Sequence, residues 1–157
     1  MSKFNLKGFI KASNEITLVI FQFFIISLHF IKFEFLHKIK IIQTNSIFSL
    51  LGFIIIIIAL IIIILAIKDL GSNLSPFPRP IANGNLVTSG IYGFIRHPMY
   101  YSLIIISFGV FIIKLSFYYL CLTISLTLVI KFKIILEEKY LKNKFENYLL
   151  YKDKVKY

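Results

Sequence analysis

The chain has 157 residues, of which 58% are hydrophobic, and its mean hydropathy is +0.84. A soluble domain contains about 45–50% apolar residues, so this composition excludes an ordinary soluble globular protein. The formal net charge is +11. Membrane topology explains this charge better than nucleic-acid binding does, and we expect no nucleic-acid partner.

Four apolar segments follow one another along the chain. The first covers residues 14–36, and the second, residues 46–68, contains the uncharged run IFSLLGFIIIIIALIIIILAI. Segments 98–113 and 115–133 are separated only by Lys114 and form a predicted helical hairpin. Backbone in lipid must satisfy its own hydrogen bonds, so these runs are expected to be helices. The sequence predicts an all-α integral membrane protein, a single domain with about four transmembrane helices.

The distribution of positive charge indicates the topology. Fourteen lysines and arginines lie in the N-terminal segment, the middle loop with its flanks and the tail from Lys131 onward, whereas the other side carries four. By the positive-inside rule both termini are cytosolic. We expect a multi-pass protein of a prokaryotic inner membrane. We also expect it to be a monomer, because no small-xxx-small face for helix association is visible. The one cysteine, Cys121, lies in an apolar run and is expected to be a packing residue.

Two regions interrupt the apolar pattern. The loop at 69–97 contains SPFPRP at 75–80, which cannot be regular helix because its prolines alternate. A loop of this length is usually either functional or disordered. The tail at 134–157 has helical periodicity with lysines between its apolar positions. It is predicted to be a cytosolic amphipathic helix on the membrane surface.

The stretch SGIYGFIRHPMYYS places two basic residues at a predicted helix start. Arg96 and His97 directly precede Pro98, which suits the first helical turn. They would therefore lie beside free helix amides, where anions bind. Alternatively, Arg96 anchors the helix by contacting lipid phosphates.

Two adjacent acids, Glu137 and Glu138, follow the last apolar segment in a chain with only seven acidic residues. Ionisable groups near membrane depth are functional candidates. The alternative is a solvated helix with pairs four residues apart, Lys133 with Glu137 and Glu138 with Lys142. Both interpretations place these carboxylates at the cytosolic membrane boundary.

Aromatic residues follow at three-residue spacing, at Phe145, Tyr148 and Tyr151. They could be interfacial aromatics, which we favour for Tyr151 but not for Tyr148. His29 and His37 have no partner at metal-ligand spacing, so we predict no metal site.

The segment LVTSGIYGFIRHPMYYS, followed by a helical hairpin and EEKYLKNKFENYLLY, resembles the membrane methyltransferase superfamily of isoprenylcysteine carboxyl methyltransferases and phospholipid N-methyltransferases. That superfamily shares G-x-Y-x-x-x-R-H-P-x-Y and, further along, E-E-x-x-L-x-x-x-F-G-x-x-Y-x-x-Y. The matching positions here are Gly90, Tyr92, Arg96, His97, Pro98 and Tyr100, then Glu137, Glu138, Leu141, Phe145, Tyr148 and Tyr151. The resemblance covers roughly residues 70–155.

The resemblance implies a cytosolic-facing pocket for S-adenosylmethionine and a lipid or prenylated small molecule as methyl acceptor in the bilayer. The cofactor-binding residues it implies are Tyr92, Arg96, His97, Pro98, Tyr100, Glu137 and Glu138. The catalytic residues it implies are Arg96, Glu138 and Tyr148.

Three departures keep alternatives open. Glu146 replaces the glycine of the second motif, and Lys133 and Lys139 stand where arginine is common. Lysine cannot form the bidentate fork that arginine forms on a carboxylate, so a prenylcysteine acceptor does not follow. The alternatives are an NADPH-dependent reductase of the sterol and steroid reductase type, or a non-catalytic membrane homologue.

Overall fold

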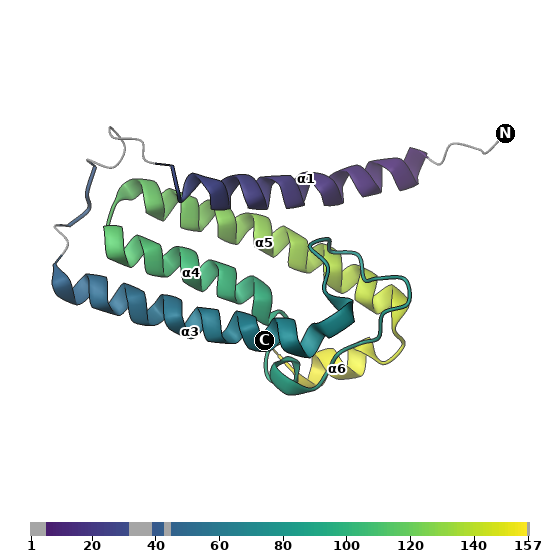
Figure 1. The fold of residues 1–157 in the computed structure, drawn as a ribbon. Coiled ribbons are helices and arrows are strands. Elements are labelled where there is room, and N and C mark those ends of the chain that lie inside the picture. The colour runs from purple at the N-terminus through teal and green to yellow at the C-terminus, as the bar shows by residue number, and fades with distance from the viewer. Residues whose placement is uncertain (1–5, 32–38, 43–44, 157) are drawn as a thin grey trace.

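The computed structural model describes residues 6–31, 39–42 and 45–156. Within these residues the chain forms five α-helices and two short 3₁₀ turns, and its only β pairing is an isolated bridge between Lys40 and Ser116. The helices are α1 (Leu6–Leu28), α3 (Ser46–Leu70), α4 (Pro98–Lys114), α5 (Phe117–Lys144) and α6 (Tyr148–Lys154). The four long helices lie alongside one another, and α6 packs at one end of the bundle (Figure 1). The predicted all-α class is confirmed.

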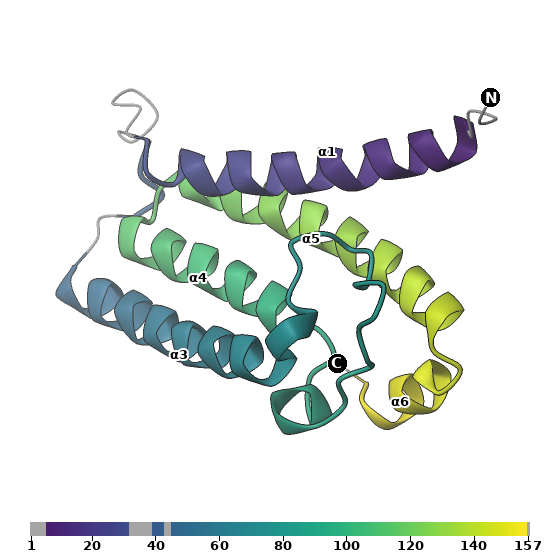
Figure 2. The same ribbon diagram turned by 45° about the vertical axis from the view of Figure 1, so that its right-hand side comes forward.

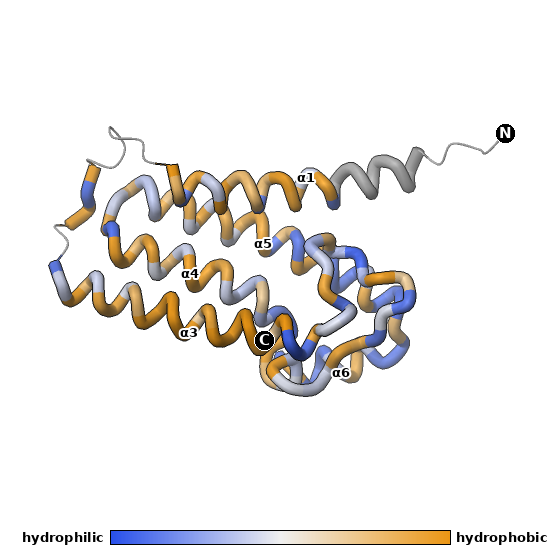
Figure 3. Tube along the Cα trace, viewed as in Figure 1, coloured by the Kyte–Doolittle hydropathy of each residue, from blue (hydrophilic) through white to orange (hydrophobic). Residues whose placement is uncertain are grey.

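Two helices are long and apolar enough to span a membrane, over Ser46–Asn73 and Phe117–Lys144. The apolar helices at Glu15–Leu28 and Pro98–Lys114 are shorter. Orange, apolar residues dominate the helical body, whereas blue, hydrophilic residues gather at the end that carries α6 (Figure 3). This distribution indicates a membrane protein, and the number of four spans stays a prediction.

The observed helix bounds differ from the predicted segments in two places. Helix α1 begins at Leu6 and ends at Leu28, ahead of the predicted segment's end at 36; residues 32–38 lie outside the described part of the chain. Helix α5 continues without interruption to Lys144. Glu137 and Glu138 therefore stand on the same helix as the apolar core. Cys121 is exposed on this helix, so the prediction that it is a packing residue was wrong.

Helices α3 and α4 approach closely because small residues face the contact. The buried residues of α3 are Gly52, Ala59 and Ala66, which repeat every seven residues. A Cβ atom on Gly52 would lie 2.7 Å from the carbonyl oxygen of Gly109 on α4. A small-residue face therefore exists at seven-residue spacing, in place of the four-residue spacing of a small-xxx-small motif, and it is used within the chain. The monomeric state stays a prediction.

Helix α1 packs on α5, and three polar residues at seven-residue spacing lie along the helix and the turn that follows it. We call Glu15 and Gln22 of α1 and His29 of that turn the polar row of α1. Each member contacts a polar side chain of another element: Tyr140 and Arg79 for Glu15, Lys133 for Gln22, and Ser107 for His29. The polar row sets the rotation of α1 on the bundle.

The loop between α3 and α4 crosses the hydrophilic end of the bundle, where it passes between α3 and α5 (Figure 2). It contains 3₁₀ turns at Gly71–Asn73 and Gly90–Gly93. Gly90 has a φ of +60°, and a Cβ atom there would collide with the Asp69 carboxylate. That carboxylate accepts a hydrogen bond from the backbone N–H of Ile91 at 2.7 Å. Glycine is therefore required where the loop turns toward α4.

Candidate active site

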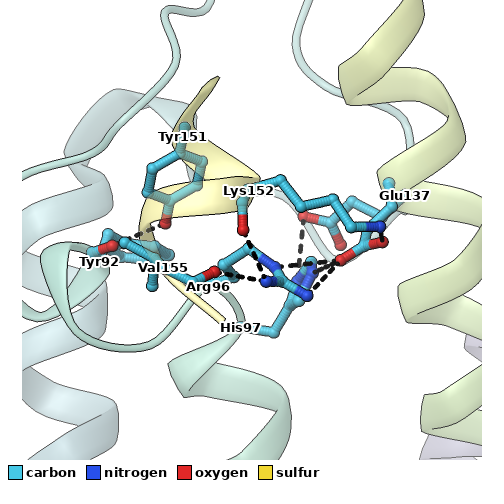
Figure 4. Close-up of polar contacts among 8 residues, drawn as sticks. Tyr92, Arg96, His97, Glu137, Tyr151, Lys152 and Val155 are labelled. Atoms are coloured by element: carbon cyan, nitrogen blue, oxygen red, sulfur yellow. Dashed lines mark hydrogen bonds and ion pairs between the residues drawn. The ribbon is translucent and has the colours of Figure 1, made fainter. Parts of the chain in front are cut away.

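The two sequence motifs meet at the hydrophilic end of the bundle. Arg96 approaches Glu138 Oε1 through Nε at 3.2 Å and through Nη2 at 3.1 Å. His97 Nε2 lies 3.4 Å from the same oxygen, and His97 Nδ1 lies 4.0 Å from Glu137 Oε1 (Figure 4). The residue pair before α4 and the acid pair late in α5 therefore form one cluster, which we call the Arg-His-Glu cluster.

Helix α6 and the residues after it complete this cluster. Lys152 Nζ donates to Glu138 Oε2 at 2.5 Å. Arg96 Nη1 donates to the backbone carbonyls of Lys152, at 3.4 Å, and of Val155. The side chains of Arg96 and Glu138 are only 14% and 16% exposed. Arg96 thus links the start of α4 to both α5 and the C-terminal segment.

Three tyrosines surround the cluster. Tyr151 Oη donates to the backbone carbonyl of Tyr92 at 2.6 Å, and both residues are buried. The expectation that Tyr151 is an interfacial aromatic was therefore wrong. Burial raises the pKa of the Tyr151 phenol to about 12 and, together with the charge of Glu137, raises the pKa of Tyr92 even more. Both phenols keep their protons throughout the physiological range.

Tyr148 has a buried hydroxyl without a hydrogen-bond partner among the residues that the structure describes. The residue is 1% exposed and packs with Tyr151 and Val155. Burial raises the pKa of its phenol well above the ordinary value, and the nearby charge of Glu138 raises it further. An unsatisfied buried hydroxyl costs about 1–3 kcal/mol. The hydroxyl lies beside Glu138 in the protein interior.

A cavity of about 400 Å³ lies beside the cluster. Its volume falls within the usual range for small-molecule sites, about 300–1,000 Å³. Five of the residues implied as cofactor-binding line it: Tyr92, Arg96, His97, Tyr100 and Glu137. Pro98 instead starts α4 as a buried helical residue, and Glu138 and Tyr148 lie outside the cavity lining. The remaining walls come from α1, α3, the proline-containing loop and α5.

Comparison with known families gives a match for most of the chain. The family model described as phospholipid methyltransferase matches residues 47–148. The chain belongs to the phospholipid methyltransferase family. The recognition made from the two motifs is confirmed at this level. No curated protein and no solved structure matches the chain.

Membership of the phospholipid methyltransferase family supports methyltransferase activity at a membrane. It favours this activity over the reductase alternative. The matched stretch includes α3, α4, α5 and both polar pairs, whereas α1 lies outside it. The cavity of this phospholipid methyltransferase family member is therefore built partly from a helix that the family model does not match.

The structure also decides how the ionisable residues of α5 are paired. Glu138 pairs with Arg96 and Lys152, and no ion pair with Lys142 forms. Lys133 donates to Gln22 and to the Pro76 carbonyl. Within the described residues Lys133 has no carboxylate within 4.0 Å. The predicted alternative of pairs four residues apart was therefore wrong.

Several residues of the site were not singled out from the sequence, namely Gln22, Lys152 and Val155. Gln22 had a usable signal, because it lies seven residues from Glu15 and seven from His29. Lys152 and Val155 had none, since their positions depend on how the tail folds back. The part of the chain that the structure describes contains no cluster of three or more metal-ligating side chains, and His37 lies outside that part.

Proposed function

We propose that this protein is an S-adenosylmethionine-dependent methyltransferase that methylates a lipidic acceptor in the membrane. One observation carries the proposal. Arg96 and His97 face Glu137 and Glu138 beside a single cavity at the hydrophilic end of an apolar helical bundle. Such a site gives a polar cofactor access from water and an apolar acceptor access from lipid.

The donor and acceptor groups in the cavity wall fit the cofactor. S-adenosylmethionine carries a carboxylate, an ammonium group, two ribose hydroxyls and a sulfonium. His97 and Arg96 suit the carboxylate, because hydrogen bonds between a cation and a carboxylate are strong. Glu137, whose side chain is 26% exposed, suits the ammonium or a ribose hydroxyl. Tyr148 and Glu138 lie behind this wall and outside the cavity lining, so they support the site without facing the cavity.

The chemistry requires positioning and the exclusion of water more than it requires reactive side chains. When bound, the cofactor supplies an electrophilic methyl group, whose bond to sulfur breaks as the acceptor's lone pair attacks carbon, leaving the electron pair on a neutral sulfur. Correct alignment of two reactants accounts for much of the rate enhancement in such reactions. Arg96 acts here by fixing Glu138 and the C-terminal segment against α4. Where the acceptor carries a proton, Glu137 is the carboxylate in the cavity wall to receive it.

Topology forms part of the same proposal. The cluster, the loop between α3 and α4, and α6 share one end of the bundle (Figure 1), and we assign this end to the cytosolic side. Most lysines and arginines lie in the segments predicted on this side, which supports the assignment by the positive-inside rule.

The test is cofactor binding by the purified protein in a neutral detergent. Radiolabelled S-adenosylmethionine should bind saturably, and NADPH should not compete. His97→Ala and Glu137→Gln should abolish binding with helix content unchanged, whereas Glu146→Gln, at an exposed position of the tail, should bind like the parent. Parental affinity in His97→Ala would overturn the site assignment. Thermal stabilisation by NADPH, with none by S-adenosylmethionine, would favour a reductase.

The acceptor can be found by transfer of label. The protein is incubated with methyl-labelled cofactor and a total lipid extract, and the labelled product is identified by mass spectrometry. We expect label in an amphipathic lipid. Label appearing only in water-soluble products would contradict a lipidic acceptor.

A further inference from the structure

One wall of the cavity is formed by α1. Gln22, Phe23 and Ile26 line the cavity from this helix. The proline-containing loop and Lys133 of α5 form the adjoining walls. Because α1 lies outside the stretch matched by the family model, this wall is a separate feature from the motif-bearing wall.

Three cationic side chains line the cavity, and two of them are neutralised by a carboxylate. Arg79 Nη2 lies 3.0 Å from Glu15, and Arg96 Nη2 lies 3.1 Å from Glu138. Lys133 is different. Among the residues that the structure describes, no carboxylate lies within 4.0 Å of its ammonium group.

The hydrogen bonds of Lys133 hold its ammonium in place and come from neutral groups. The residue is 1% exposed. Its Nζ donates to Gln22 Oε1 at 2.5 Å and to the Pro76 carbonyl at 3.0 Å, and it lies 5.1 Å from the centroid of the Tyr100 ring. An ammonium has three donors, so one more hydrogen bond can be made. The charge of Glu137, one turn later on α5, acts on Lys133 without forming an ion pair, so the buried ammonium is only partly compensated.

We propose that Lys133 recognises the methyl acceptor by binding an anionic oxygen group, a phosphate or a carboxylate, of an amphipathic molecule. The apolar chain of the acceptor lies against Phe23, Ile26 and Leu103, which line the same cavity. Gln22 is a positioning residue that fixes the ammonium from α1. This inference rests on the proposed methyltransferase function, which supplies the reaction that the acceptor undergoes.

The arrangement of charge supports an acceptor anion at Lys133. Arg79 is paired with the Glu15 carboxylate and Arg96 belongs to the proposed cofactor site, whereas the two hydrogen-bond partners of Lys133 carry no charge. The polar row places Glu15 and His29 on either side of Gln22, so α1 is held above and below the proposed contact. A fixed ammonium binds an anion with little further loss of side-chain entropy.

The test compares anionic and neutral amphiphiles on the purified full chain in a neutral detergent. The probes are dodecyl phosphate, dodecanoate and 1-dodecanol, titrated with and without S-adenosylmethionine, and affinity is read from the shift in thermal unfolding midpoint. The parent should bind the two anionic probes more tightly than dodecanol. Tighter binding of dodecyl phosphate would indicate a phospholipid-like acceptor, and tighter binding of dodecanoate would indicate a carboxylate acceptor.

Lys133→Met should weaken binding of the anionic probes by about 10- to 100-fold, the range for hydrogen bonds to a charged group. Affinity for dodecanol and for S-adenosylmethionine should stay within about twofold of the parent. Lys133→Arg should restore most of the anion affinity, because it restores the charge. Lys131→Met is the matched control, since it removes the same charge from an exposed position of the same helix and should bind like the parent.

Gln22→Leu provides a second variant if Lys133→Met does not fold. Loss of the hydrogen bond from the ammonium to Gln22 should weaken the anionic probes by about 3- to 10-fold, because Gln22 acts only by positioning Lys133. Its control is Ser107→Ala, which removes the partner of His29 outside the cavity lining and should leave probe affinity unchanged.

Two results would overturn the inference: unchanged anion affinity in Lys133→Met, or a parallel loss of S-adenosylmethionine binding, which would assign Lys133 to the cofactor. Failure of the parent to bind S-adenosylmethionine would instead overturn the proposed function. The effect of Lys133→Met on anion binding is measured in titrations without S-adenosylmethionine, so the two failures can be told apart.

Discussion

The Arg-His-Glu cluster makes Glu138→Gln the most informative single substitution. The Glu138 carboxylate accepts from Arg96 and Lys152 and lies 3.4 Å from His97. Glutamine keeps the size of the side chain but replaces one oxygen by an NH₂ group. A donor then faces either Arg96 or Lys152, both of which are donors themselves. The contact between α4, α5 and the C-terminal segment should therefore weaken.

The size of the effect follows from the exposure of each partner. The Lys152 side chain is 41% exposed, so its ion pair contributes about 0–1 kcal/mol. Arg96 is 14% exposed, and a hydrogen bond between charged groups at such a site contributes about 1.5–3 kcal/mol. We expect a total loss of about 1.5–4 kcal/mol. For a chain of this length each kcal/mol lowers the unfolding midpoint by about 2–4 °C, which gives about 3–16 °C.

The assay is thermal unfolding followed by circular dichroism in detergent, with Glu146→Gln as the matched control. Glu146 is exposed, and its substitution changes the net charge by the same amount. Limited trypsin digestion should cleave after Lys152 faster in Glu138→Gln than in Glu146→Gln, because the C-terminal segment is released. Equal midpoints and equal cleavage rates in the two variants would refute the reasoning.

Three further predictions concern packing, the unpartnered hydroxyl and pH. Gly52→Ala should lower the unfolding midpoint by about 2–12 °C, because its Cβ would meet the Gly109 carbonyl oxygen at 2.7 Å and overpacking costs about 1–3 kcal/mol. An unchanged midpoint would contradict the close contact between α3 and α4. Tyr148→Phe should keep or raise the midpoint, since it removes a buried hydroxyl that has no hydrogen-bond partner among the described residues; a clear drop would show that the hydroxyl is satisfied. Burial raises the pKa of Tyr151 from 10.0 to about 12, so its stabilisation should be complete below pH 10 and disappear between pH 10 and about 12. Alkaline melts of the parent and of Tyr151→Phe should differ below that window and converge above it.

The meeting of the two motifs was predictable from the sequence because both lie at membrane boundaries. Pro98 indicates a helix start directly after Arg96 and His97, and Glu137 follows an apolar segment that returns to the same side. Topology alone therefore brings them to one end of the bundle. The match to the family model agrees with the motif reading.

The contribution of the tail was not predictable in the same way. Its apolar periodicity indicates one amphipathic helix, whereas α5 ends at Lys144 and Phe145 adopts extended backbone with φ −120° and ψ 115°. No glycine or proline marks this break in the sequence. Tyr148 and Tyr151 pack against the protein, and Leu149 and Leu150 stay exposed, so a position at the membrane surface remains a prediction for α6.

The contacts of α1 were predictable only in part. The spacing of Glu15, Gln22 and His29 is visible in the sequence, and Lys133 and Tyr140 repeat at the same interval on α5. An antiparallel pairing of the two helices could have been inferred from these intervals. The partner Arg79 could not, because it lies on a loop whose path has no local sequence signal.

The regular spacing of the polar row limits which insertions and deletions α1 can accept. Inserting one residue between Glu15 and Gln22 would rotate every later side chain by about 100° around the helix axis, since an α-helix has 3.6 residues per turn. Gln22 and His29 would then turn away from their partners and toward hydrocarbon. A whole heptad would restore the face but would move the later residues about 10 Å along the axis, past their partners. Substitution is therefore the open route by which this wall of the cavity can diversify.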